Sequence, residues 1–232
     1  MICAIHQPQF LPWLGYFDKI DKSDIFVFLD NVQYKKNEWQ NRNRIKIAHG
    51  WQWLTIPVKY RFGQRINEIL IDYSKDWRPK HWQALITNYQ KSPYFKDYRD
   101  FFQKVYQQNW RYLAEINIYL IRKLMKFLGI EKEMKKASDL GIKGEKTIRL
   151  VEICKVLGAD TYLSGQGAKD YLDLEKFKRA KIEVIFQEFA HPIYRQNYQG
   201  FEPNLSIIDL LFNEGKKSLS LLRGRAKKDK NV

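Results

Sequence analysis

The sequence predicts an α/β protein with a Rossmann-like, mostly parallel sheet and a helical insertion. Two short apolar runs, residues 2–5 and 25–29, flank a segment with helical spacing, and strand, helix and strand in this order indicate a βαβ unit. The second run is apolar throughout, which is typical of a strand buried on both faces of a parallel sheet. Strands and helices alternate again after residue 138.

Length and composition restrict the class of protein. The 232 residues suffice for one large domain or for a domain with a sizeable insertion. Hydrophobic residues make up 44% of the chain and aromatic residues 15%, which excludes disorder for most of it. The mean hydropathy is -0.55, and no apolar run approaches the roughly 20 residues of a membrane-spanning helix. Because the N-terminus also lacks the features of a secretion signal, we expect a soluble, cytoplasmic protein.

The first third of the chain should alternate between strands and loops around one helix. Residues 6–12 contain two prolines and are therefore expected to form a loop. Leu14, Phe17 and Ile20 are three positions apart and predict a helix. The alternating, β-rich residues 51–58 predict a further strand.

The middle of the chain predicts three helices, and the last third returns to an α/β pattern. Periodic apolar residues mark the three helices, the third of which ends at Gly129. The elements expected after residue 138 are a helix over 147–157, a strand over 162–164, a helix over 168–180, a strand over 182–189 and a helix over 205–212. The resulting division is an N-terminal part of the α/β domain (1–72), a helical insertion or subdomain (73–137), a C-terminal part of the α/β domain (138–222) and a basic flexible tail (223–232).

The charge of the chain favours anionic partners. Forty-one Lys and Arg residues against 26 Asp and Glu residues give a net charge of +15. Such an excess attracts nucleotides, phosphorylated sugars or nucleic acid. The alternatives are a solvated basic surface and a composition shaped by growth temperature.

Polar side chains follow the predicted strands, where ligands bind in open α/β sheets. His6 follows the first strand, and an imidazole can act as a general acid or base. Asp30 follows the second strand, where a carboxylate can bind sugar or ribose hydroxyls. We therefore take both as candidate catalytic residues. The alternatives are a histidine that hydrogen-bonds its own loop and an Asx turn of Asp30 with Asn31.

Three segments supply the candidate substrate-binding residues. Arg42 and Arg44 alternate with Asn side chains, and these groups suit bidentate contacts with phosphates, carboxylates or bases. The alternatives for this strip are a solvated strand face and a weak nucleic-acid surface. The turn after residue 163 contains glycine, which lets a backbone approach a ligand closely. The full set is Gln7, Gln33, Tyr34, Lys35, Arg42, Asn43, Arg44, Ser164, Gly165 and Gln166. The spacing of the residues indicates no metal site, and it names no cofactor.

Two N-terminal blocks resemble the WbqC-like family. Residues 6–20 read HQPQFLPWLGYFDKI, and residues 30–45 begin with DNVQY and end with WQNRNRI. The resemblance continues over residues 53–58, 162–165, 171–172 and 203–212, and it covers nearly the whole chain. It implies a bacterial or archaeal protein of surface-polysaccharide (O-antigen-type) biosynthesis and a transferase that places an amino acid or acyl group on a sugar.

A second resemblance concerns the fold. The strand–loop–helix opening, with Gly15 at the helix entrance, is similar to the start of HIGH-type nucleotidyltransferases and pantothenate-synthetase-like ligases. Residues 205–209 occupy the place of a late helix that contacts phosphates in those enzymes. Trp13 and Tyr16 stand where two catalytic histidines would be, and Asp209 stands where an arginine would be. This departure argues against adenylyl transfer by the usual residues.

The sequence and the resemblances together favour an enzyme. We expect a transferase that places a small acyl or aminoacyl group on an activated sugar, with a nucleotide, a nucleotide sugar or an acyl donor as its anionic partner. One alternative is a nucleotidyltransferase or ATP-dependent ligase of HIGH-type fold. Another is a non-catalytic nucleic-acid-binding protein that uses the basic strip 35–46.

Overall fold

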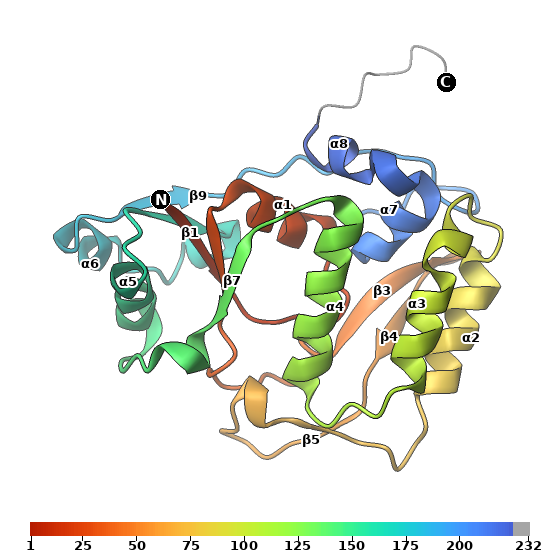
Figure 1. The fold of residues 1–232 in the computed structure, drawn as a ribbon, viewed down its shortest axis with the longest axis horizontal. Coiled ribbons are helices and arrows are strands. Elements are labelled where there is room, and N and C mark those ends of the chain that lie inside the picture. Colours follow the sequence, from red (N-terminus) through yellow and green to blue (C-terminus); the bar gives the residue numbers. More distant parts are fainter. Residues whose placement is uncertain (225–232) are drawn as a thin grey trace.

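The computed structural model, which describes residues 1–224, contains a five-stranded parallel sheet, which lies in the left half of Figure 1. The strands lie in the order β7–β2–β1–β8–β9, so the third strand of the sheet along the chain is at one edge and the fifth at the other. Their bounds are Ile2–His6 (β1), Ile25–Phe28 (β2), Glu133–Lys136 (β7), Thr161–Ser164 (β8) and Glu183–Phe186 (β9). This order is that of Rossmann sheets, and the predicted α/β fold class is confirmed.

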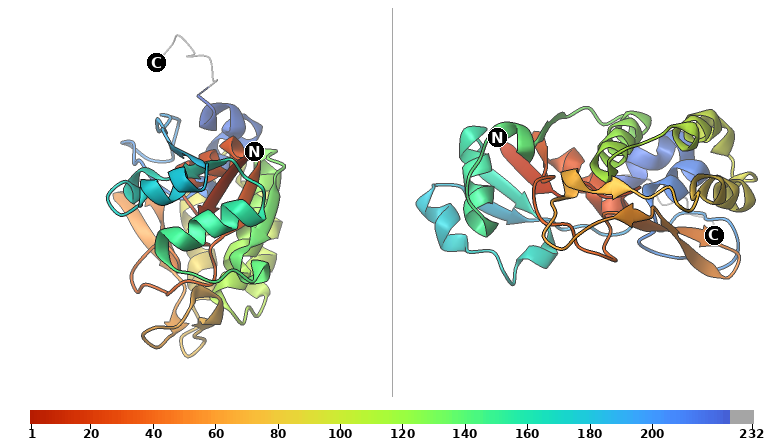
Figure 2. Two further views of the ribbon diagram at one scale, coloured as in Figure 1. Left: turned by 90° about the vertical axis from the view of Figure 1, so that its left-hand side faces the viewer. Right: turned by 90° about the horizontal axis from the view of Figure 1, so that it is seen from below.

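Both faces of the central strands are buried, because side chains alternate between two apolar clusters. Cys3 and Ile5 of β1 face α5 (Lys146–Val156) and α6 (Leu174–Arg179). Ala4 of β1 faces the opposite cluster, which includes α1 (Leu14–Lys22). The helices on the two faces thus form a three-layer α/β/α arrangement around β1 and β2, as Figure 2 shows.

The connection between β2 and β7 contains most of the remaining structure. It holds the hairpin of β3 (Arg42–Ile47) and β4 (Gly50–Thr55), the pair β5 (Val58–Lys59) and β6 (Leu70–Ile71), and the helices α2 (Arg78–Tyr89), α3 (Phe95–Gln107) and α4 (Leu113–Leu128). These elements share one continuous apolar core with α1 and with α7 (Ile207–Glu214). A last short helix, α8 (Ser218–Leu222), follows α7. In Figure 1, α2 and α3 lie at the opposite end of the molecule from α5 and α6.

The expected helix over 168–180 is wrong in its first half. Only a single 3₁₀ turn, Gln166–Ala168, and the short α6 form there. The N–H of Asp173 donates to the hydroxyl of Thr147 in α5. It therefore makes no helical hydrogen bond to a carbonyl oxygen of the preceding turn. Tyr171, two residues earlier, is largely exposed.

Several strands also differ from the sequence-based expectation. β3 and β7 were not predicted, because their polar residues conceal the strand pattern. The expected strand over 51–58 is divided into β4 and β5 around Pro57. β9 ends at Phe186, since the next side chain, Gln187, turns toward α1 and donates to the carbonyl oxygen of Gly15.

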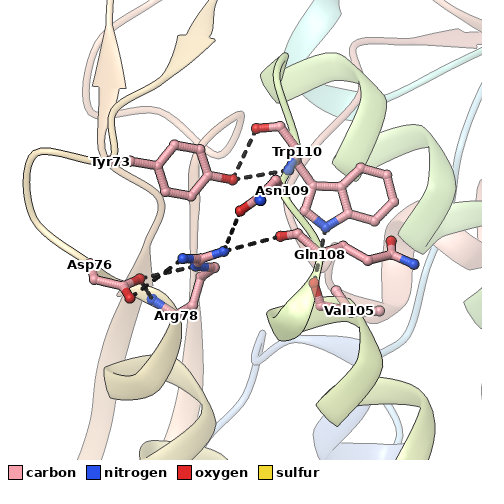
Figure 3. Close-up of polar contacts among 7 residues, drawn as sticks. All are labelled: Tyr73, Asp76, Arg78, Val105, Gln108, Asn109 and Trp110. Carbon is pink, nitrogen blue, oxygen red and sulfur yellow. Dashed lines mark hydrogen bonds and ion pairs between the residues drawn. The ribbon is translucent and has the colours of Figure 1, made fainter.

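Polar contacts join the start of α2 to the loop between α3 and α4 (Figure 3). The guanidinium of Arg78 donates to Asp76 at 3.0 Å and to the Oδ1 atom of Asn109 at 2.6 Å. The Tyr73 hydroxyl donates to the carbonyl oxygen of Trp110 and accepts from its N–H. These contacts hold the start of α2 against the loop that precedes α4.

The described residues contain no helix that is both long enough and apolar enough to cross a bilayer. Most of the predicted basic tail, residues 225–232, lies outside the residues that the structure describes.

A buried asparagine links the helical layer to the loop after β1. The Nδ2 atom of Asn117, in the middle of α4, donates to the carbonyl oxygens of Pro8 (3.2 Å) and Gln40 (2.7 Å). Asn117 is fully buried, so no water can replace it.

We expect Asn117→Ala to lower the free energy of unfolding by about 2 kcal/mol, because two buried carbonyl oxygens would lose their donor. Urea denaturation measures this change. The control is Gln107→Ala at an exposed position of α3, for which the loss should stay below about 1 kcal/mol. Equal effects of the two substitutions would contradict the linking role of Asn117.

Candidate active site at the carboxyl edge of the sheet

The connections of the sheet change direction between β1 and β8, and the ends of these two strands create a crevice. His6 is the last residue of β1, and Ser164 is the last residue of β8. Two cavities open beside His6, one of about 500 Å³ and one of about 290 Å³, and His6 lines both. The carboxyl edge of the sheet therefore carries the best candidate for an active site.

His6 is held as a neutral imidazole. Its Nδ1 atom lies 3.1 Å from the carbonyl oxygen of Gln7, which can only accept, so Nδ1 carries the proton and Nε2 remains an acceptor. The Tyr16 hydroxyl donates to the same carbonyl oxygen, and the two rings meet edge to face at 4.9 Å. Burial, together with the positive charge of Lys19, lowers the pKa of His6 to about 3.

The larger cavity has a basic lining. Lys35, Lys146 and Arg149 contribute positive charge, and Glu38 is the only carboxylate among its lining residues. Lys146 and Thr147 belong to the first turn of α5, whose dipole places partial positive charge at this end. The cavity therefore favours an anionic ligand.

Hydrogen bonds hold Arg149 in place at this cavity. Its Nε atom donates to the carbonyl oxygen of Gly144 at 2.8 Å, and its Nη1 atom donates to that of Asn31 at 3.0 Å. Three aromatic residues, Trp39, Tyr162 and Tyr171, line the same cavity. A ligand with both a phosphate and a ring would match this combination.

The smaller cavity has aromatic walls. Trp13 and Phe189 meet edge to face at 5.5 Å, and Tyr16 adds a third ring. A Cβ atom at Gly15 would lie 2.3 Å from the Trp13 ring, so this position of α1 requires glycine for the ring to lie where it does. The Nε2 atom of Gln187 donates to the carbonyl oxygen of Gly15 at 2.8 Å and thereby holds the far wall against α1.

Lys19 is a site residue that the sequence analysis missed. It is only 4% exposed, lies in α1 and lines the smaller cavity. Among the described residues its ammonium has neither a hydrogen-bond acceptor nor a carboxylate partner, and the neighbouring Asp18 pairs with Lys22 at 3.0 Å. Burial lowers the pKa of Lys19 to about 8. The sequence held one signal for this role. Lys19 comes three residues after Tyr16, which places both side chains on the same side of the predicted helix.

Four of the predicted binding residues line the two cavities. Gln7 and Lys35 line the larger one, and Gly165 and Gln166 line the smaller one. Ser164 is fully buried at the end of β8, and its hydroxyl is directed to the carbonyl oxygen of Gly165.

Asp30, the second candidate catalytic residue, lines neither of the cavities beside His6. Its carboxylate accepts from the N–H of Ser138 at 3.0 Å and from the Ser138 hydroxyl at 2.7 Å. β7 lies beside β2, so the residues that follow these strands meet there, and Asp30 joins them. It lines a separate cavity of about 670 Å³ beside α4, together with Lys136.

The predicted arginine strip lies on the β3–β4 hairpin and lines neither cavity at His6. Arg42 stacks on the ring of Trp53 at 4.3 Å, and Arg44 stacks on Trp51 at 4.9 Å. Asn43, on the opposite face of β3, is buried and donates to the carbonyl oxygen of Leu11 at 2.8 Å. Its side chain therefore supports the loop after β1.

The remaining two predicted residues lie along the segment before the hairpin. Tyr34 is buried against Tyr60, with 5.2 Å between the ring centroids. Gln33 is exposed and forms an isolated β-bridge with Arg65. Neither lines a cavity that His6 borders.

Comparisons with known proteins match this sequence to one family. The model of the WbqC-like protein family matches residues 7–221. A protein of Mycobacterium tuberculosis, described as uncharacterized protein Rv1507c, is 39% identical over 224 residues, which are 95% of this chain and 96% of that protein. No solved structure gives a significant match.

We expect Lys19→Met to raise the free energy of unfolding at pH 7 by about 1–3 kcal/mol, because it removes a buried, unpaired ammonium whose pKa is lowered to about 8. The pH dependence of this stability difference follows from proton binding at Lys19. Between pH 8 and pH 10.5 the unfolded chain binds more protons at Lys19 than the folded protein does, so wild-type stability rises there relative to the variant.

Urea denaturation at pH 7 and at pH 10.5 measures both values. The gain should be largest at pH 7 and small at the higher pH. Lys22→Met, at an exposed lysine in the same helix, is the control and should give no gain. A destabilised Lys19→Met protein at pH 7 would refute the unpaired state of this ammonium.

Proposed function

The chain belongs to the WbqC-like protein family, and from this premise we propose that it is a biosynthetic transferase that places a small acyl or aminoacyl group on an activated sugar. One observation carries the proposal: His6 borders both cavities. A substrate in the larger cavity and a second one in the smaller cavity would therefore meet at one imidazole. That is the arrangement which a group transfer between two substrates needs.

The lining of the larger cavity supports a phosphate-bearing sugar there. Lys35, Lys146 and the first turn of α5 would neutralise a diphosphate, while Tyr162 and Tyr171 offer rings for a base or sugar. A volume of about 500 Å³ lies in the range of ligand pockets. The smaller cavity, at about 290 Å³, would hold the transferred group.

The tautomer of His6 supports a role as general base. Its Nε2 atom can accept the proton of a sugar hydroxyl or amino group while that group forms a bond to the acyl carbon. The bond between the acyl carbon and its leaving group then breaks, and the proton passes from Nε2 to the leaving group. Burial makes free His6 a weak base, and the negative charge of a bound phosphate would raise its pKa toward neutrality.

A nucleotidyltransferase or ligase is the second candidate, and the sheet order favours it as a fold. The residues of the site do not support adenylyl transfer by the usual groups. Trp13 and Tyr16 are aromatic walls of the smaller cavity. Asp209 is buried and accepts hydrogen bonds from the hydroxyls of Tyr89 and Tyr194, so it occupies no phosphate site.

Nucleic-acid binding is a candidate from another class, favoured by the stacked Arg42 and Arg44 on the hairpin. Such binding would use the hairpin face and not the cavities at His6. It would weaken uniformly with salt, and Arg44→Ala would reduce the salt slope by about one unit.

A single lysine substitution tests the anionic substrate of the larger cavity. We expect Lys35→Ala to weaken binding of UDP-N-acetylglucosamine by roughly fivefold, because one phosphate contact is lost. Isothermal titration calorimetry at constant salt measures the affinity. Lys36→Ala is the matched control, since Lys36 is exposed and does not line the cavity.

The same two variants separate the function classes. A transferase predicts a loss for Lys35→Ala alone and unchanged tRNA binding in both. Equal losses of tRNA affinity in both variants, with no binding of the nucleotide sugar by the wild type, would favour the nucleic-acid alternative and contradict the transferase.

A further inference from the structure

We propose that the smaller cavity is a subsite for a small carboxylic acid, amino acids included, whose carboxylate is bound by the ammonium of Lys19. The proposal is independent of the proposed function and includes no transfer step, because a free carboxylate carries no leaving group. Binding of the acid itself follows from the cavity alone.

The charge balance of the cavity points to an anion. Lys19 is the only lysine or arginine among the lining residues, and no carboxylate lines the cavity beside it. A buried charge without a partner is costly, and a bound carboxylate would supply the missing counter-ion. The free protein therefore keeps an ammonium ready for a ligand that brings a negative charge.

The position of the ammonium limits where the carboxylate can lie. The Nζ atom of Lys19 lies 3.1 Å from the place that a Cβ atom at Gly165 would occupy. Nothing lies within 4 Å of such an atom at Gly167. The open space is thus bordered by Lys19 and by the glycine turn after β8, where the backbone leaves room for a small polar group.

The other walls select against a phosphate group and in favour of a carboxylate with an apolar body. Phosphate binding normally uses several donors. The Nε2 atom of Gln187 already donates to the carbonyl oxygen of Gly15 and to Asp18, and that of Gln166 donates to the carbonyl oxygen of Gln187, so one amide N–H is left beside the Lys19 ammonium. Trp13, Tyr16 and Phe189 offer apolar surface for the rest of the molecule.

His6 adds one acceptor to this subsite. Its Nε2 atom is the acceptor that remains when Nδ1 donates to the carbonyl oxygen of Gln7. The amino group of an amino acid could donate to Nε2 while its carboxylate binds Lys19. The cavity volume of about 290 Å³ restricts the acid to a small one.

The experiment follows the ε-CH₂ signal of Lys19 by ¹H–¹³C NMR in protein labelled with ¹³C-lysine, with the signal assigned by its absence in Lys19→Met. Titrations with pH are recorded with no ligand, with glycine, with acetate and with inorganic phosphate. We expect glycine and acetate to raise the pKa of Lys19 by about one unit, which corresponds to a tenfold preference of the acid for the charged ammonium. Phosphate should leave the Lys19 signal unchanged.

Two further variants keep the test decisive if Lys19→Met folds poorly. Gly165→Ala should weaken acid binding, because its Cβ atom fills the space beside the ammonium, while the Lys19 signal remains visible. Lys36→Met should bind the acids like the wild type, since Lys36 is exposed and does not line this cavity.

The outcomes separate this inference from the proposed function. A Lys19 signal that responds to neither acid, or that responds to phosphate alone, overturns the carboxylate subsite. Binding of UDP-N-acetylglucosamine, measured on the same samples, reports on the larger cavity independently. If the nucleotide sugar binds and the acids do not, the inference fails while the transferase remains. If the acids bind and the nucleotide sugar does not, the subsite stands and the sugar substrate fails.

Discussion

The site depends on the change of direction in the parallel sheet between β1 and β8. Chain segments leave these two neighbouring strands toward opposite faces, so no connection covers the carboxyl ends between them. His6 is the last residue of β1 and lies beside the resulting gap. Asn117 and Asn43 donate to carbonyl oxygens of the loop that follows His6 and so hold that loop in place.

The smaller cavity combines a neutral base with an ammonium in one desolvated space. Burial lowers the pKa of His6 to about 3 and that of Lys19 to about 8, because the charged form of each group loses its hydration. A folded chain can tolerate this because two apolar clusters on the faces of the sheet supply the stability. Destabilised groups of this kind are typical of functional sites.

The sequence predicted the parts of the fold whose residues repeat a clear period, and it placed His6 at the end of the first strand. The apolar runs of β1 and β2 and the spacing in α1, α3 and α4 are local signals, and the structure has all five elements. β7 has the sequence EMKK and pairs only at the edge of the sheet, so its strand character comes from a distant partner. Asp30 and Lys19 show the same limit, because the pairing of Asp30 with Ser138 and the isolation of Lys19 are decided by tertiary contacts.

The most direct test of the account is the ¹⁵N spectrum of the His6 imidazole at pH 7, assigned with a His6→Gln variant. The account predicts a neutral ring with the proton on Nδ1, and it predicts that a nucleotide sugar and a small amino acid each shift the Nε2 resonance in separate titrations, since His6 lines both cavities. A protonated ring at pH 7, or saturation with both ligands that leaves the His6 resonances unmoved, would contradict it.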